Sequence, residues 1–174
     1  DREYAAASLA RPAAMRSLLI DTIRRRGGVI RRDDALALFP LHVVDDALRT
    51  AALVVAHPGV YRLPDADDRS THWRAALAYC RTGALSHTDA LELWGLPSSL
   101  SERVHVTVGP DASAAKSPGV RQHRRLTYAP EAPLVRERDG FRVVRLEQAI
   151  LESWPLLPLL DRRAPAIVAV RDRR

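Results

Sequence analysis

The stretch Leu53-Val-Val-Ala-His-Pro-Gly-Val-Tyr-Arg-Leu63 constrains the fold more than any other part of the sequence. Apolar residues stand on both sides of Pro58-Gly59, so the stretch predicts two short strands joined by a tight turn. A two-stranded hairpin alone is only marginally stable in water. The rest of the chain must therefore supply a surface on which this hairpin packs.

Three helical segments precede the hairpin and predict such a surface. Apolar residues recur at helical spacing over residues 13–26, 33–39 and 41–52, and a short strand fits at 28–30. Helix, short strand, helix, helix and hairpin is the element order of a winged helix-turn-helix domain. The residues expected to close the small core beneath the hairpin are Val54, Val60 and Leu63.

A polar linker at residues 65–70 leads into a second part of mixed structure. Helices are predicted from residue 73, at 84–97, at 146–154 and from 165, and strands at 103–108, 120–128 and 141–144. We therefore predict an α+β fold in two domains. Residues 1–64 form a winged helix-turn-helix, and residues 71–174 form a small mixed α/β domain with a short antiparallel sheet. The chain begins without Met and stops inside a helical pattern, so we expect the second domain to be truncated at its C-terminus.

Composition narrows the class of protein. No apolar run reaches the roughly 18 residues that a membrane span needs, and the N-terminus has no signal-peptide pattern, so a cytoplasmic location is expected. Cys80 is the only cysteine, which excludes an intrachain disulfide and a site built from several cysteines. The net charge is +6, and residues 71–174 carry 16 Lys plus Arg against 11 acids. This excess favours an anionic partner, although an arginine-rich composition also follows from a G+C-rich genome.

Four segments carry a family resemblance. They are, in chain order, RRRGGVIRRDDAL, HPGVYRL, GALSHTDALELWGLP and RVHVTV followed by PGVRQHR. Over roughly residues 15–160 the sequence resembles the AbiEi-type antitoxin family of type IV toxin–antitoxin systems. It is equally similar to the front part of longer proteins that append a very-short-patch-repair-type endonuclease domain. The resemblance implies a winged helix that binds its own promoter and a following α/β domain that helps to neutralise a nucleotidyltransferase-like toxin.

In a helix-turn-helix the second helix of the pair enters the major groove. Here that helix is 41–52, whose exposed positions include Asp45 and Asp46, and two carboxylates facing phosphates need compensation. Basic residues at the start of the preceding helix and in the hairpin could supply it. The predicted DNA contacts are Arg31, Arg32, His42, Arg49, His57 and Arg62. The alternative is a winged helix used only for protein interaction, since fold does not fix function.

A second basic stretch begins within the predicted strand 120–128 and extends to Arg145. We predict that this stretch forms a surface that binds an anionic partner, either the DNA backbone or an acidic patch on a toxin. The residues predicted for this surface are Arg121, His123, Arg124, Arg125 and Arg142. The alternative is a solvated face on which these residues pair with neighbouring acids such as Glu131 and Glu137. Steep salt dependence of binding would distinguish the two.

No catalytic arrangement stands out in residues 1–174, so we expect no enzyme activity from them. Lys116 lacks the Asp/Glu-x-Lys context of a restriction-type nuclease, so a nuclease site would lie beyond Arg174. Ser86, His87 and Asp89 are interpreted as a helix cap with a common histidine. Cys80 is interpreted as a buried hydrophobe.

Two histidines invite a metal interpretation. His105 and His123 could face each other on adjacent strands, but a metal would need a third ligand and the sequence indicates none. We therefore predict neither metal nor cofactor. The function predicted is that of a DNA-binding, antitoxin-like transcriptional autorepressor that also binds a toxin protein. The alternatives are the targeting part of an endonuclease, or an interaction module without nucleic acid.

Overall fold

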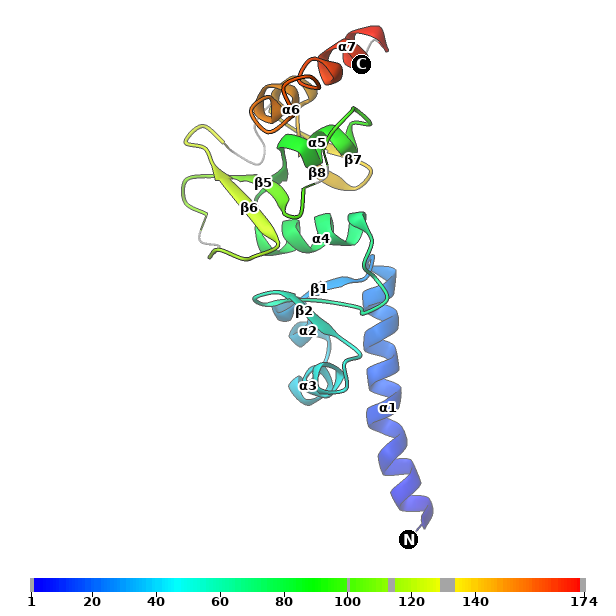
Figure 1. Ribbon diagram of the computed structural model, residues 1–174. Helices are drawn as coiled ribbons and strands as arrows, with labels where there is room; N and C mark the ends of the chain where they lie inside the picture. The colour runs from blue at the N-terminus through cyan, green and yellow to red at the C-terminus, as the bar shows by residue number, and fades with distance from the viewer. Residues whose placement is uncertain (1, 100, 113–114, 129–133, 173–174) are drawn as a thin grey trace. The chain divides into compact units, whose positions relative to one another are not determined.

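The computed structural model describes residues 2–99, 101–112, 115–128 and 134–172, with backbone alone before residue 13 (Figure 1). The described residues form a mixed α+β structure with seven helices and two sheets, which confirms the predicted class. They divide into two compact units, Asp1–Tyr79 and Cys80–Arg174. Among these residues, no helix combines the length and the apolar character that a membrane crossing requires.

The first unit is built from four helices and a three-stranded sheet. Its elements are α1 (Arg2–Arg25), β1 (Val29–Arg31), α2 (Arg32–Leu38), α3 (Leu41–Arg49), β2 (Val54–His57), β3 (Val60–Arg62) and α4 (Arg69–Tyr79). The sheet order is β1-β3-β2 and both pairs are antiparallel. The predicted hairpin is therefore present, and β1 adds a third strand along β3.

Two glycine positions define where the elements of the first unit turn. Val60 pairs with His57, so Pro58 and Gly59 form a two-residue turn in which Gly59 has a φ of +71°. Proline followed by glycine in the left-handed region is the chemistry of a type II turn. At the end of α1 the Gly28 N–H donates to the Ile23 carbonyl at 3.0 Å, which closes the helix.

Strands β1 and β3 of the small sheet are buried on both faces. Ile30 and Tyr61 belong to the core that α1, α2 and α3 form, whereas Val29 and Val60 pack with Ala75 of α4. Val60 was predicted to lie in the core beneath the helix pair, and this is wrong because β3 alternates its side chains between two helical layers. Leu63 does join the helix-side core. Val54 is only half-buried and belongs to neither cluster.

Helix α4 belongs to the first unit, whereas the sequence interpretation placed it in the second. Ala75 covers the face of the sheet opposite α3, and the Arg74 Nε donates to the Gly27 carbonyl at 3.2 Å. A polar segment at 65–70 indicated a linker, but it is a connection inside the unit. Its composition follows from lying at the surface and not from separating two domains.

The second unit contains a five-stranded mixed sheet. Its elements are β4 (Ala84–Leu85), α5 (His87–Leu93), β5 (Val104–Val108), β6 (Val120–Arg124), β7 (Val135–Arg138), β8 (Phe141–Val144), α6 (Leu146–Ser153) and α7 (Ala164–Arg171). The strand order is β6-β5-β4-β8-β7. Strands β5 and β6 are parallel, and so are β4 and β8, so the predicted antiparallel sheet is wrong for these two pairs.

The burial of the two central strands β4 and β5 fits a sheet that contains parallel pairs. All five residues of β5 are buried, and the two residues of β4 are fully buried, which is typical of strands covered on both sides. Strand β4 is so short that the sequence interpretation absorbed it into the following helix. Helix α5 contacts β5, β8 and α6, so it lies against the middle of the sheet (Figure 1).

Candidate functional site

The helix pair of the first unit exposes three of the six predicted DNA contacts. Arg32 begins α2, and His42 and Arg49 lie on α3; all three side chains are exposed. The opposite side of α3 is buried through Val43, Val44 and Ala47. The exposed side of α3 therefore carries His42 and Arg49.

The carboxylate of Asp46 on α3 is compensated from within the unit. Arg16 Nη1 of α1 lies 3.0 Å from Asp46 Oδ2, and Arg49 donates to the other carboxylate oxygen. The pKa of Asp46 lies below its usual value, and the hydrogen bond from Arg49 is the largest cause of this shift. The negative charge of Asp46 is thereby offset by Arg16 and Arg49. The basic residues at the start of α2 and in the hairpin, which were predicted to offset it, take no part in these contacts.

The other three predicted DNA contacts are engaged inside the protein. Arg31 Nη2 lies 2.7 Å from Asp33. His57 is buried beside the ring of Tyr79, with 5.3 Å between the ring centroids, and this burial lowers its pKa. Arg62 donates hydrogen bonds to the segment that follows the hairpin.

Arg62 clamps the segment that follows β3. Its Nη1 donates to the carbonyl oxygens of Leu63, Pro64 and Ala66 at 3.1, 3.3 and 3.1 Å, and its Nη2 lies 3.1 Å from Asp67. A guanidinium is suited to this task because it carries five donors in a rigid plane. The geometry gives Arg62 a structural part within the hairpin.

Two of the five predicted members of the anionic-partner surface line one hollow in the second unit. Arg121 and Arg124 of β6 border an open hollow of about 740 Å³. Its other lining residues are Arg103, Lys116, Ser117, Pro118, Val120 and Gln122. Among the lining residues that the structure describes, four are cations and none is a carboxylate, which suits an anionic ligand.

The other three members are engaged in contacts of their own. Arg125 Nη2 lies 2.6 Å from Glu152 Oε1, and Arg142 donates to the carbonyl of Arg81. His123 is directed toward two other histidines. The basic stretch of the sequence is therefore split between a hollow and several fixed contacts.

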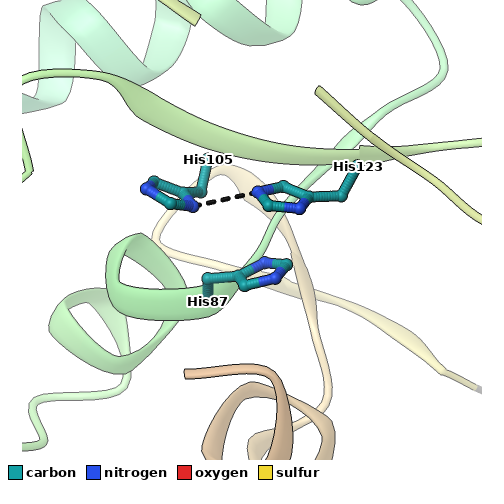
Figure 2. A group of neighbouring side chains, drawn as sticks. All are labelled: His87, His105 and His123. Carbon is teal, nitrogen blue, oxygen red and sulfur yellow. Dashed lines mark hydrogen bonds between the residues drawn. The ribbon is translucent and has the colours of Figure 1, made fainter. Parts of the chain in front are cut away.

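Three histidines of the second unit meet where α5, β5 and β6 come together (Figure 2). His87 begins α5, His105 is the second residue of β5, and His123 lies on β6. One nitrogen from each ring lies within 4.8 Å of the others. His105 Nδ1 and His123 Nε2 are hydrogen-bonded at 3.0 Å, and the rings of His87 and His123 stack with 3.6 Å between their centroids. We call these three residues the histidine cluster.

Polar side chains hold the outer nitrogens of the histidine cluster. His87 Nδ1 lies 3.0 Å from Ser86 Oγ and 3.5 Å from Glu152 Oε2, and His105 Nε2 lies 3.2 Å from Ser101 Oγ. The predicted cap at the start of α5 is wrong in detail, because the Ser86 side chain makes no capping hydrogen bond and contacts the imidazole of His87.

Asp89 also departs from its predicted part in a capping box. It is fully buried, and its Oδ2 accepts a hydrogen bond from the backbone N–H of His105 at 2.8 Å. Asp89 therefore links α5 to β5 immediately beside His105. Cys80, in contrast, is buried as predicted, and burial raises the pKa of its thiol to about 11.

Burial keeps two members of the histidine cluster, His87 and His123, uncharged at neutral pH. Removal from water lowers the pKa of His87 to about 3 and that of His123 to about 4, and nearby arginines lower both pKa values further. Burial also raises the pKa of Glu152. A hydrogen bond from Gln148 and the charge of Arg125 act in the opposite direction and offset only part of this rise. At neutral pH the rings of His87 and His123 are neutral imidazoles, the form in which histidine binds a metal ion.

His87 is held in an unusual backbone conformation. Its φ is +54°, in the left-handed region that residues other than glycine rarely adopt. Such a conformation costs about 1–3 kcal/mol and persists only when its surroundings impose it. In this conformation the imidazole of His87 stacks on that of His123 (Figure 2).

The third histidine is what the sequence interpretation missed. His105 and His123 were expected to face each other, and they do: in the parallel pair β5–β6, His105 lies two positions before Thr107, the strand partner of His123. His87 was interpreted as a common helix residue because β4, the two-residue strand before it, was not recognised. Because β4 (Ala84–Leu85) pairs with β5, the residues that follow β4, including His87, lie beside His105 of β5.

Comparison with solved structures finds a similar fold. The chain is similar to the crystal structure of the RV2827C protein from Mycobacterium tuberculosis, with a TM-score of 0.54 and 16% sequence identity over 81% of this chain. The match spans 60% of that protein's length, so this chain corresponds to part of it. At this identity the likeness shows the fold alone. No model of a known protein family and no curated protein matches the sequence.

Proposed function

We propose that the first unit is a winged helix-turn-helix and that the protein is a DNA-binding autorepressor of the antitoxin type. The observation that carries the proposal is the exposed side of α3, which presents His42 and Arg49 while the helix packs through its other side. A second helix placed in this way, followed by a hairpin, is how winged helices meet the major groove. The family resemblance of the sequence supports the same function.

The test uses the whole chain and a labelled duplex that carries the region upstream of its own reading frame. Binding is measured by fluorescence anisotropy at several salt concentrations, because each phosphate contact steepens the salt dependence by about 0.9 log units per log unit of salt. Arg32→Ala and Arg49→Ala should each weaken binding and reduce that slope by about one contact.

Arg163→Ala is the matched control, because it removes an equally exposed positive charge from the second unit. It should leave the salt slope unchanged. Binding that is the same in all three variants would remove the assignment to α2 and α3. Binding to no DNA at all would favour the interaction module without nucleic acid.

The antitoxin part of the proposal assigns the second unit to a protein partner. The hollow bordered by Arg121 and Arg124 suits an acidic surface, and a nucleotidyltransferase-like toxin is what the resemblance implies. Co-expression with the product of the neighbouring reading frame should relieve its toxicity and yield a complex on gel filtration. Relief that survives Arg121→Glu with Arg124→Glu would show that the partner binds elsewhere. DNA cleavage by a longer form of the chain would favour the endonuclease alternative.

A further inference from the structure

We propose that His87, His105 and His123 form a binding site for a divalent transition-metal ion of the zinc class. This site is independent of the proposed DNA-binding function, since all three ligands lie in the second unit. Three imidazoles with a fourth position left for water or another ligand make a known type of zinc site.

The spacing of the rings fits this chemistry. Zinc–nitrogen bonds of about 2.0–2.1 Å in tetrahedral geometry place two ligand nitrogens roughly 3.3 Å apart. His105 Nδ1 and His123 Nε2 are already 3.0 Å apart. The nitrogen of His87 lies within 4.8 Å of both, so a rotation of its side chain completes a three-nitrogen set.

The partners of the outer nitrogens identify which atoms would bind. Ser86 contacts Nδ1 of His87, and Ser101 contacts Nε2 of His105. The donors are therefore Nε2 of His87, Nδ1 of His105 and Nε2 of His123. Metal-binding histidines usually have the second ring nitrogen held in this way by a hydroxyl, a carbonyl or a carboxylate.

Binding needs a proton to move but none to be lost from the rings. The hydrogen bond between His105 and His123 holds one N–H between two nitrogens that must both become ligands. That proton passes to the other nitrogen of its own imidazole, so all three rings remain neutral. On His105 the other nitrogen faces the hydroxyl of Ser101, which can accept the new hydrogen bond.

Charge and backbone support the site. Glu152 is 6% exposed and brings its carboxylate to 3.5 Å from His87, which offsets part of the charge of a cation and of Arg125. The backbone of His87 adopts a strained left-handed conformation. This conformation holds the imidazole of His87 in the histidine cluster.

The experiment is a zinc titration of the whole chain after removal of metal with a chelator. Isothermal calorimetry should find one zinc ion per chain, and cobalt(II) should give the intense visible bands of a tetrahedral site. His123→Gln and His87→Asn should each weaken zinc binding by roughly 10- to 100-fold or more. Asparagine is chosen for His87 because it tolerates a positive φ. His42→Gln, which changes an exposed histidine of the first unit, is the control.

A result with no stoichiometric zinc binding overturns the proposal and leaves a hydrogen-bonded stack of histidines. So does equal binding by His123→Gln and the control. If the variants fail to fold, the wild-type chain still decides the question through imidazole ¹⁵N chemical shifts. Zinc must move the signals of His87 Nε2, His105 Nδ1 and His123 Nε2; if other histidines respond, the assignment is wrong.

Discussion

Arg16 Nη1 of α1 lies 3.0 Å from Oδ2 of Asp46 on α3, thirty residues along the chain. This ion pair joins the long first helix to the helix that we propose for DNA binding. Arg49 binds the other oxygen of the same carboxylate. Asp46 therefore fixes two arginines and keeps the side chain of Arg49 close to α3.

Asp46→Asn should strengthen binding to the promoter duplex. The change removes a negative charge from a helix that would face phosphates, and it releases Arg49 toward the solvent. We expect an affinity gain of about two- to fivefold at low salt, the range typical of one exposed charge pair. Anisotropy measures it, with Asp21→Asn on α1 as the control because that carboxylate is also exposed and paired, with Arg24. Equal gains in both variants would point to a general charge effect and not to α3.

The free energy of unfolding should fall as the pH drops below about 6.5 because of His57. Burial, and then the charge of His72, lowers the pKa of His57 in the folded protein. The unfolded chain therefore takes up a proton near the ordinary pKa of 6.5, before the folded chain does. Stability is complete above that pH and is lost as the pH falls, with a slope of up to about 1.4 kcal/mol per pH unit from this one group.

Urea unfolding at pH 7.5 and at pH 5.5 measures this dependence, and His57→Leu should reduce it. The histidine cluster contributes in the same direction in both proteins, so the difference between them isolates His57. An identical pH dependence in the two would mean that His57 is not held neutral.

Arg62→Ala should destabilise the first unit. It leaves the carbonyl oxygens of Leu63, Pro64 and Ala66 without the donor that Arg62 supplies. We expect a loss of about 1–3 kcal/mol in the free energy of unfolding. Arg62→Lys should recover little of this loss, because an ammonium cannot reproduce the planar set of donors. Chemical denaturation followed by circular dichroism provides the measurement.

The contrasting outcome for Arg62 concerns DNA. If Arg62→Ala keeps full stability and loses promoter binding, then Arg62 is a DNA contact, as the sequence predicted, and the clamp is unimportant. Asp67→Asn is a useful companion variant because it alters only the exposed contacts of Asp67 with Arg62 and His72 and should cost little.

Arg125→Ala should destabilise the second unit more than Glu152→Gln does. The carboxylate of Glu152 is buried, and Arg125 is its charged partner at 2.6 Å. Without the arginine, the buried carboxylate of Glu152 has lost its charged partner and must either stay charged in a poorly solvated place or take up a proton. We expect this to lower the free energy of unfolding by about 1–3 kcal/mol or more. In the Arg125→Ala background, Glu152→Gln should recover part of the loss, and a double-mutant cycle by urea unfolding measures this coupling. Strictly additive effects would mean that the two side chains do not interact.

Some features of this protein follow from its sequence through local chemistry. Proline and glycine at positions 58 and 59 require the turn that makes the hairpin, and glycines 27 and 28 end α1. Apolar spacing predicted α2, α3 and β5 nearly at their observed bounds. Each of these depends only on residues within a few positions of one another, and for that reason a single sequence reveals them.

Other features depend on contacts between distant segments. The parallel pairing of β5 with β6 follows from how the sheet is assembled, and no alternation of residues distinguishes it from antiparallel pairing. The two-residue strand β4 is too short to leave a periodic signal, yet its pairing with β5 and β8 is what positions His87.

The candidate site shows the same division. The sequence supplied the three histidines and suggested that two of them face each other, because their strands could be recognised. The tertiary structure alone decided that the third completes the set, since residues 87, 105 and 123 converge only when three segments pack together. It also decided that Arg62 and His57 turn inward, because burial and hydrogen bonding depend on neighbours that no local pattern encodes.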